Sequence, residues 1–178
     1  MKLTILLVPG LGNSGPQHWQ SIWATLYHHP RVEQQEWDHP RCADWVQGLN
    51  EAIQRAESPV VLVAHSLACS TIGHWAHQYP TEAVVGALLV APADTERPDF
   101  PAEATGFAPM PQQRLPFASL VVASTNDEYV SIARAQAFAA AWGSEFVDVG
   151  AQGHLNVASN LGNWPTGYAL LQKLLQQV

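Results

Sequence analysis

The sequence predicts an α/β protein in which a mostly parallel sheet carries helices on both faces. Short apolar runs rich in β-branched residues alternate with longer stretches of helical character. The short runs are apolar at consecutive positions, as expected for strands that are buried on both faces. With 178 residues, of which 47% are hydrophobic and 13% charged, the chain has the size and composition of one domain with its own core. We therefore expect a single α/β domain over residues 1–178.

Five apolar runs are expected to form the buried strands of the sheet: residues 3–8, 60–64, 84–90, 119–123 and 145–149. Residues 32–37 are a weaker candidate, because their apolar residues are sparse and prolines stand at positions 30 and 40. Proline cannot donate a backbone hydrogen bond, so we place this sixth run at an edge of the sheet.

Helical character is expected between these strands, over residues 16–27, 43–56, 67–78, 131–142 and 165–177. In the last segment Pro165 suits a first helical turn, and an apolar stripe should dock on the sheet. The stripe consists of Leu170, Leu171, Leu174 and Leu175.

Residues 92–116 interrupt this alternation, since they contain six of the 13 prolines. Proline breaks helices and is excluded from central strands, so this segment is expected to be a long loop or a small cap over one end of the sheet. The fold should accordingly have a minimal lid or none.

The charge balance argues against several classes of partner. Eight Lys and Arg against 15 Asp and Glu give a net charge of −7, which repels nucleic acid and anionic membranes. No apolar run approaches the length of about 18 residues that a membrane span needs. Cys42 and Cys69 cannot form a disulfide framework, and the N-terminus shows no signal-peptide pattern. We expect a soluble, cytoplasmic protein with reduced thiols.

The most informative segment places Ser66 directly after the strand expected at 60–64 and before a helix. Small residues, Ala64 and Ala68, stand two positions on either side of the serine. A nucleophile elbow needs this context, because the serine sits on a strained turn where large neighbours would collide with the adjoining backbone. The alternative is that Ser66 only caps the helix that begins at Leu67.

A nucleophilic serine needs an acid and a base further along the chain. Asp127 follows the strand expected at 119–123, at the sheet edge where ligands gather in open α/β sheets. An ordinary turn aspartate is the alternative for this position. Asp94 follows the preceding strand and is the competing acid, but charged neighbours suggest that it faces solvent. Asp148 lies within the last strand and should point along the sheet.

The candidate base is His154, on a glycine-bearing loop after the strand expected at 145–149. Its alternative is a loop histidine bonded to backbone. Because serine, acid and histidine occur in the required order at three strand ends, we expect Ser66, Asp127 and His154 to meet at one edge of the sheet.

The glycine-dense turn at residues 8–15 lacks the lysine of a phosphate-binding loop and fits an oxyanion loop better. A tetrahedral intermediate needs two fixed N–H donors, and the expected donors are Leu67 and Leu11. Trp19 and His65 are the expected substrate-pocket residues. The alternative for Trp19 is a core residue that packs between helices, and the alternative for His65 is a buried hydrogen-bonded histidine.

No metal or cofactor is expected from the remaining residues. His74 and His77 have a spacing compatible with shared metal ligation, but no third ligand is evident nearby, so we expect exposed helical residues. Cys69, one helical turn after the serine, is expected to fill space in the core.

These segments together resemble the small serine hydrolases related to retinoblastoma-binding protein 9. The resemblance spans nearly the whole chain and rests on VPGLGNS at 8–14, HW at 18–19, AHSLAC at 64–69, ND at 126–127, GHLN at 153–156 and WP at 164–165. It implies an α/β-hydrolase fold with little or no lid and a Ser66–Asp127–His154 triad. Ala68 and Glu128 depart from the glycine and proline that the family pattern has there.

The expected function is therefore that of a serine hydrolase, resembling a carboxylesterase, which cleaves small ester or amide substrates through an acyl-enzyme. Two alternatives remain open. One is a protein-binding module on a hydrolase fold, since fold alone does not fix function; the other is an acyltransferase or thioesterase.

Overall fold

Five parallel strands form one sheet in the order β1-β2-β3-β4-β5. The computed structural model describes residues 2–178, and the strands are β1 (Thr4–Val8), β2 (Val60–His65), β3 (Val84–Val90), β4 (Ala118–Ala123) and β5 (Glu145–Asp148). All five agree with the sequence-based expectation to within one residue at each end. Because every neighbouring pair is parallel, the carboxyl ends of all strands meet at one edge.

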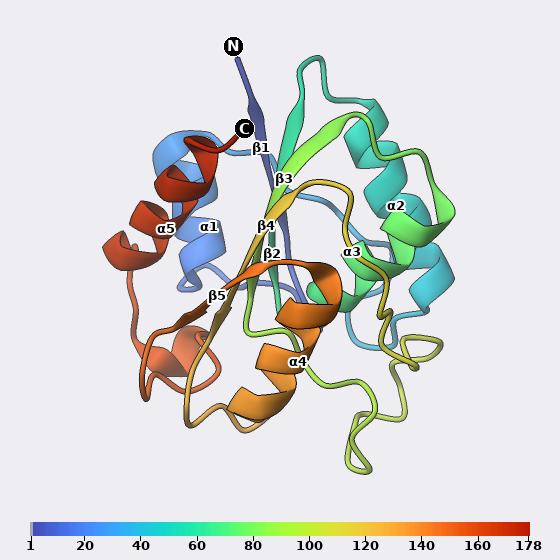
Figure 1. Cartoon of the computed structure of the whole chain (residues 1–178), viewed down its shortest axis with the longest axis vertical. Helices are drawn as coiled ribbons and strands as arrows, with labels where there is room; N and C mark the ends of the chain where they lie inside the picture. The colour runs from blue at the N-terminus through green and yellow to red at the C-terminus, as the bar shows by residue number, and fades with distance from the viewer. Residues whose placement is uncertain (1) are drawn as a thin grey trace.

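The helices form in the expected places (Figure 1): α1 (Trp19–Tyr27), α2 (Cys42–Gln54), α3 (Leu67–Gln78), α4 (Ile132–Trp142), α5 (Pro165–Leu175) and a short 3₁₀ turn, η1 (Val157–Ser159). The first helix begins three residues later than predicted. His18 is its N-cap, and the ring Nδ1 accepts a hydrogen bond from the Gln20 N–H. Among the described residues, no helix combines the length and apolar character needed to cross a membrane.

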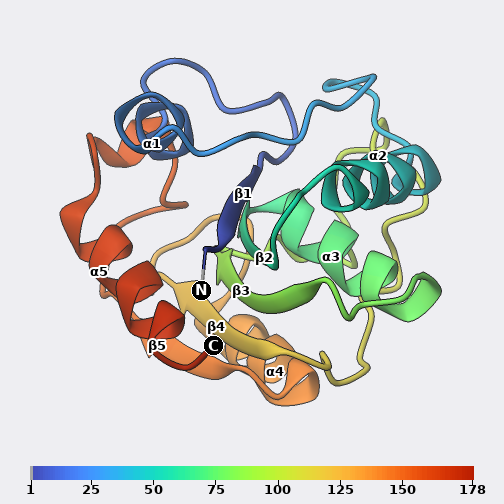
Figure 2. The same ribbon diagram turned by 90° about the horizontal axis from the view of Figure 1, so that it is seen from above.

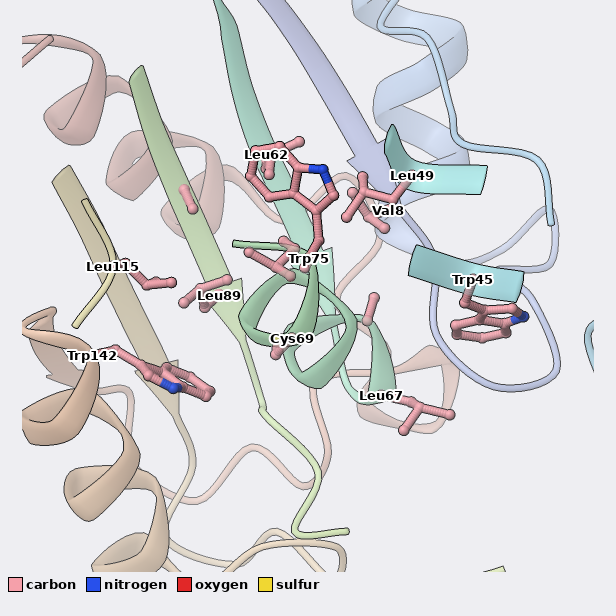
Figure 3. Packing of buried hydrophobic residues seen from close by; sticks show 14 of the residues in the cluster. Val8, Trp45, Leu49, Leu62, Leu67, Cys69, Trp75, Leu89, Leu115 and Trp142 are labelled. Atoms are coloured by element: carbon pink, nitrogen blue, oxygen red, sulfur yellow. The ribbon is translucent and has the colours of Figure 1, made fainter. Parts of the chain in front are cut away.

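The helices cover both faces of the sheet, as the apolar strands predicted. Helices α2, α3 and α4 pack on one face, and α1 and α5 pack on the other, as Figure 2 shows. Side chains alternate between the two cores along each strand: in β1, Leu6 and Val8 join the larger core, whereas Ile5 and Leu7 join the smaller one. Figure 3 shows part of the larger core around Trp75.

The prediction of an edge strand at residues 32–37 is wrong. The chain pairs with β1 through a single parallel bridge between Leu7 and Arg31, in which the Leu7 N–H donates to the Pro30 carbonyl and the Val32 N–H donates to the Leu7 carbonyl. Beyond that point the segment turns toward α2, where the buried Gln34 amide donates to the Trp45 carbonyl. This segment has too few apolar side chains to be buried as a sixth strand, so its pairing with β1 ends after one bridge.

Residues 92–116 contain no helix or strand, as their prolines predicted. The segment is nevertheless fixed to α3, because the Phe107 carbonyl accepts hydrogen bonds from Ser70 and His74. Thr95 of the same segment donates to this carbonyl as well. His74 is therefore half-buried and hydrogen-bonded, not exposed as expected, while His77 is exposed. The Phe107 and Met110 side chains are buried in the larger core.

Candidate active site

Three loops at the carboxyl edge of the sheet bring Ser66, Asp127 and His154 together. The His154 Nε2 lies 2.8 Å from the Ser66 Oγ, and the His154 Nδ1 lies 2.9 and 2.8 Å from the two carboxylate oxygens of Asp127. A carboxylate can only accept, so Nδ1 carries the ring proton and Nε2 is free to accept the proton of the serine hydroxyl. This is the hydrogen-bonding pattern by which a neighbouring base can activate a serine hydroxyl.

The turn that carries Ser66 is strained. Its φ of 58° and ψ of −123° lie in a region that side-chain-bearing residues seldom adopt, at a cost of about 1–3 kcal/mol. The Ser66 N–H donates to the Val90 carbonyl at 2.9 Å, which holds the turn. The hydroxyl makes no capping hydrogen bond to α3, so the alternative role of a helix cap is wrong. The side chain is instead directed to His154.

The small residues around the elbow fit their positions. Ala64 and Ala68 are fully buried, and Ala68 lies within α3 and is not among the residues with positive φ, so glycine is not required there. Gly10 is the glycine that the elbow does require. A Cβ at Gly10 would lie 2.7 Å from the His65 carbonyl oxygen and 3.1 Å from the Ser66 Cβ. The sequence placed Gly10 in a glycine-dense turn but did not show that it touches the elbow.

The two expected oxyanion donors both line the cavity in front of Ser66. Leu67 begins α3, and an N–H in the first turn of a helix has no intrahelical partner. The Leu11 N–H makes no backbone hydrogen bond within residues 2–178. The positive end of α3 adds to the attraction for a developing negative charge. Both N–H groups are therefore available to an oxyanion.

The loops that carry the acid and the base are tied to each other. The Asn126 Oδ1 accepts hydrogen bonds from the Ser124 hydroxyl at 2.9 Å and from the Gly153 N–H at 2.7 Å. The Asp127 side chain is completely buried, and its Oδ1 also accepts from the Tyr129 N–H. Asn126 thus fixes the spacing of Asp127 and His154. The sequence shows that Asn126 is the neighbour of Asp127, but it does not show the hydrogen bond to the loop of His154.

Asp94, the competing acid, is engaged elsewhere. Its carboxylate accepts two hydrogen bonds from Arg134, at 2.8 and 3.0 Å, and its side chain is only 10% exposed. Burial alone would raise the pKa of Asp94, but hydrogen bonds from Arg134 and from the Glu96 N–H hold it below its usual value. The expectation that Asp94 faces solvent is wrong, because Arg134 compensates a buried carboxylate.

A cavity of about 650 Å³ opens in front of the three side chains. Besides Ser66 and His154 it is lined by Leu11, His18, His65, Arg97, Phe100, Tyr129 and Val157, among others. His65 therefore lines the cavity as expected. The sequence predicted that the proline-rich loop covers this edge, and Arg97 and Phe100 of that loop do line the cavity. It did not identify these two residues individually, nor Tyr129 of the acid loop, because only the folded path of the chain brings them here.

The expectation that Trp19 walls the pocket is wrong. Its ring is 1% exposed and packs against Trp23 and Trp164, at ring-centre distances of 4.7 and 5.0 Å. The Trp19 indole N–H donates to the Leu155 carbonyl at 2.8 Å. Trp19 thus packs beneath the loop that carries His154 and holds it through this hydrogen bond. The spacing of Trp19 and Trp23, one helical turn apart on one face, was the available signal that both are buried.

Two further histidines lie beside His154. The His65 and His154 rings are 4.9 Å apart, and those of His18 and His65 are 4.8 Å apart. Burial, together with the nearby Arg31 and His154 side chains, lowers the pKa of His18 to about 4. Burial, with His154 and His18 as neighbours, also lowers the pKa of His65 well below its usual value. Both rings are therefore neutral near pH 7.

The cysteines and possible metal ligands offer no second chemistry at this edge. Burial raises the pKa of the Cys42 thiol to about 12 and raises that of Cys69 as well, so neither is an activated nucleophile. Cys69 fills space in the core as expected. In the part of the chain that the structure describes, no three His, Cys, Asp or Glu side chains are grouped to hold a metal ion.

A parallel sheet with a serine elbow after β2 and an acid and a histidine on later loops is the arrangement of the α/β-hydrolase fold. Within that class, the serine hydrolase family model matches residues 5–173, and the chain belongs to this family. No curated protein matches the chain.

Solved structures agree with this assignment. The chain is similar to a YdeN-like hydrolase from Pectobacterium atrosepticum, with 35% identity over 97% of this chain and 90% of that chain and a TM-score of 0.85. It is also similar to the ydeN gene product from B. subtilis, with 20% identity over 99% and 100% of the two chains and a TM-score of 0.79. A serine hydrolase involved in carbazole degradation is 14% identical over 99% and 92%, with a TM-score of 0.73. The last two show the fold alone.

Proposed function

We propose that this protein hydrolyses small carboxylic esters or amides through an acyl-enzyme on Ser66. The observation that carries the proposal is the unbroken series of hydrogen bonds from the Ser66 hydroxyl through His154 to the buried Asp127 carboxylate. A structural serine would need neither the strained elbow nor the histidine tautomer that Asp127 selects.

The acylation step follows from this geometry. The Ser66 Oγ attacks the substrate carbonyl carbon while its proton moves to the His154 Nε2, and the carbonyl electron pair moves onto the oxygen. The N–H groups of Leu67 and Leu11 stabilise that oxyanion. When the intermediate collapses, the bond from carbon to the leaving group breaks, and the leaving group takes the proton from His154. Asp127 stabilises the transient imidazolium.

Deacylation repeats the sequence with water in place of the serine. Water gives a proton to His154 and attacks the acyl carbon, and Ser66 leaves with that proton while the carboxylic acid is released. The 650 Å³ cavity is within the usual range for small-molecule sites, and residues 92–116 are held by hydrogen bonds to α3. These features favour compact substrates over long-chain lipids. The narrower relation to hydrolases related to retinoblastoma-binding protein 9 is part of this proposal.

Hydrolysis of p-nitrophenyl acetate by the purified protein tests the proposal. The wild type should turn over the ester, Ser66→Ala should lose several orders of magnitude in kcat with the fold intact, and Ser14→Ala should remain active. Ser14 is the matched control, because it is a buried serine whose hydroxyl donates to Gln20 rather than to His154. A folded wild type without turnover would favour the binding module, and transfer of the acetyl group to an added alcohol or thiol in preference to water would favour an acyltransferase.

A further inference from the structure

One hydrogen bond joins the nucleophile elbow to the loop that carries His154. His65, the residue before Ser66, places its ring Nε2 2.9 Å from the backbone carbonyl oxygen of His154, 89 positions away in the chain. A carbonyl oxygen can only accept, so the His65 Nε2 carries a proton and donates it. His65, the neighbour of Ser66 in the chain, thus holds the backbone of His154 in place.

The loop at His154 depends on such side-chain donors. Gly153 and Leu155 both have positive φ, of 61° and 52°, and no regular helix or strand includes this stretch. The His154 carbonyl is held by His65, and the next carbonyl, that of Leu155, is held by the Trp19 indole N–H. Two consecutive carbonyls are therefore fixed by side chains from β2 and α1.

The surroundings of His65 require a neutral donor. Its ring is 5% exposed and faces the rings of His154, His18 and Trp19, at centre distances of 4.9, 4.8 and 6.1 Å. His154 becomes positively charged whenever it takes the serine proton, so a charged side chain at position 65 would oppose that step. A neutral imidazole N–H supplies the hydrogen bond without this repulsion.

We propose that His65 is a positioning residue whose neutral Nε2–H holds the His154 backbone so that the imidazole stays in register with the Ser66 Oγ. This inference deepens the proposed function and rests on it. His65 touches neither the scissile bond nor the oxyanion in this role; it acts through His154. Loss of the bond should therefore lower kcat and leave KM nearly unchanged, because substrate contacts elsewhere in the cavity persist.

A pair of substitutions separates this role from simple packing. In His65→Gln the amide can place an N–H donor near the position of the imidazole Nε2, whereas His65→Leu fills similar space without a donor. We expect His65→Gln to retain kcat within about threefold and His65→Leu to lose about 100-fold, the effect of a small misplacement of a reacting group. KM for p-nitrophenyl acetate should change less than threefold in both.

His74 provides the matched control. Its Nε2 also donates to a loop carbonyl, that of Phe107 at 3.1 Å, but it lies outside the candidate site. His74→Leu should lower the urea midpoint, His74→Gln should lower it less because the amide keeps an N–H donor, and neither should change kcat. If His65→Leu likewise loses stability alone, or if His65→Gln loses as much kcat as His65→Leu, the positioning role is overturned.

Failure of this inference is distinguishable from failure of the proposed function. A wild type that neither turns over esters nor reacts at Ser66 removes the proposed function; an active wild type with an unaffected His65→Leu removes only the positioning role. If His65→Leu does not fold, ¹⁵N NMR of the His65 ring in the wild-type protein tests the positioning role instead. At pH 7 the ring should be the neutral Nε2-protonated tautomer that donates to the His154 carbonyl, and a ring protonated at Nδ1 alone would overturn the inference.

Discussion

Replacing Asp127 by asparagine tests the acid while preserving its shape. Both carboxylate oxygens lie within 2.9 Å of the His154 Nδ1, and the side chain has no access to water. An asparagine can turn its amide NH₂ toward Nδ1, which moves the ring proton to Nε2 and removes the acceptor for the Ser66 hydroxyl. The imidazolium that forms during acylation also loses the adjacent negative charge.

The expected loss in kcat is about 10²–10⁴-fold, which corresponds to roughly 3–5.5 kcal/mol of transition-state stabilisation at 1.36 kcal/mol per decade. The assay compares kcat and KM for p-nitrophenyl acetate at one pH, with circular dichroism and urea unfolding to confirm that the variant folds. KM should change little. An Asp127→Asn variant within threefold of the wild type would refute the assignment of Asp127.

Asp94→Asn is the matched control, since it makes the same change at the competing carboxylate. The variant should keep kcat within about threefold and lose about 1 kcal/mol of unfolding free energy. The loss is small because Arg134 is 39% exposed and water can replace part of the interaction. The opposite ranking of the two variants would move the acid to Asp94 and leave Ser66 and His154 in their roles.

Three further predictions concern the elbow, the cavity and pH. Gly10→Ala should lower kcat roughly 10- to 100-fold, because the added Cβ would lie 2.7 Å from the His65 carbonyl oxygen and displace the oxyanion loop; unchanged kinetics would show that this loop can move freely. In a series of p-nitrophenyl esters, kcat/KM should be highest for acyl chains of about two to six carbons, and rates that climb to long chains would reveal a lipid tunnel. The folded state keeps His18 neutral to about pH 4 whereas the unfolded chain binds a proton near pH 6.5, so stability falls as pH decreases through this window. Urea unfolding at pH 7 and pH 5 should show a loss of roughly 2 kcal/mol from His18, and His18→Asn, which retains an N-cap acceptor, should reduce it.

Much of the site could be predicted because its signals are local. A buried strand, a serine between small residues and a helix specify an elbow, and the parallel order of the strands then brings the loops after β4 and β5 to the same edge. The predictions of Asp127 and His154 follow from their order in the chain together with their positions after two predicted strands. Strands β1 to β4 were equally accessible, since apolar runs mark them, whereas β5 is a short edge strand with an exposed acidic residue at each end.

Apart from the edge strand expected at residues 32–37, the errors concern the direction in which a side chain points. Trp19 follows the glycine-dense loop directly, but the phase of α1 turns its ring under the His154 loop instead of into the cavity. Asp94 is buried because Arg134, 40 positions away, meets it. The His65 hydrogen bond to His154 likewise joins distant segments. Such pairings arise from the folded path of the chain. The helical spacing of Trp19 and Trp23 indicates that both are buried, but it does not show which loop Trp19 contacts.

Covalent labelling with a fluorophosphonate tests the central claim most directly, because such a probe reacts with a serine whose hydroxyl is activated by a neighbouring base. Intact-mass and peptide-mapping analysis of the labelled protein should show one adduct per chain, located on Ser66 and absent from Ser66→Ala. An adduct that persists in Ser66→Ala, or that maps to Ser14 or Cys69, would contradict the assignment of Ser66 as the nucleophile.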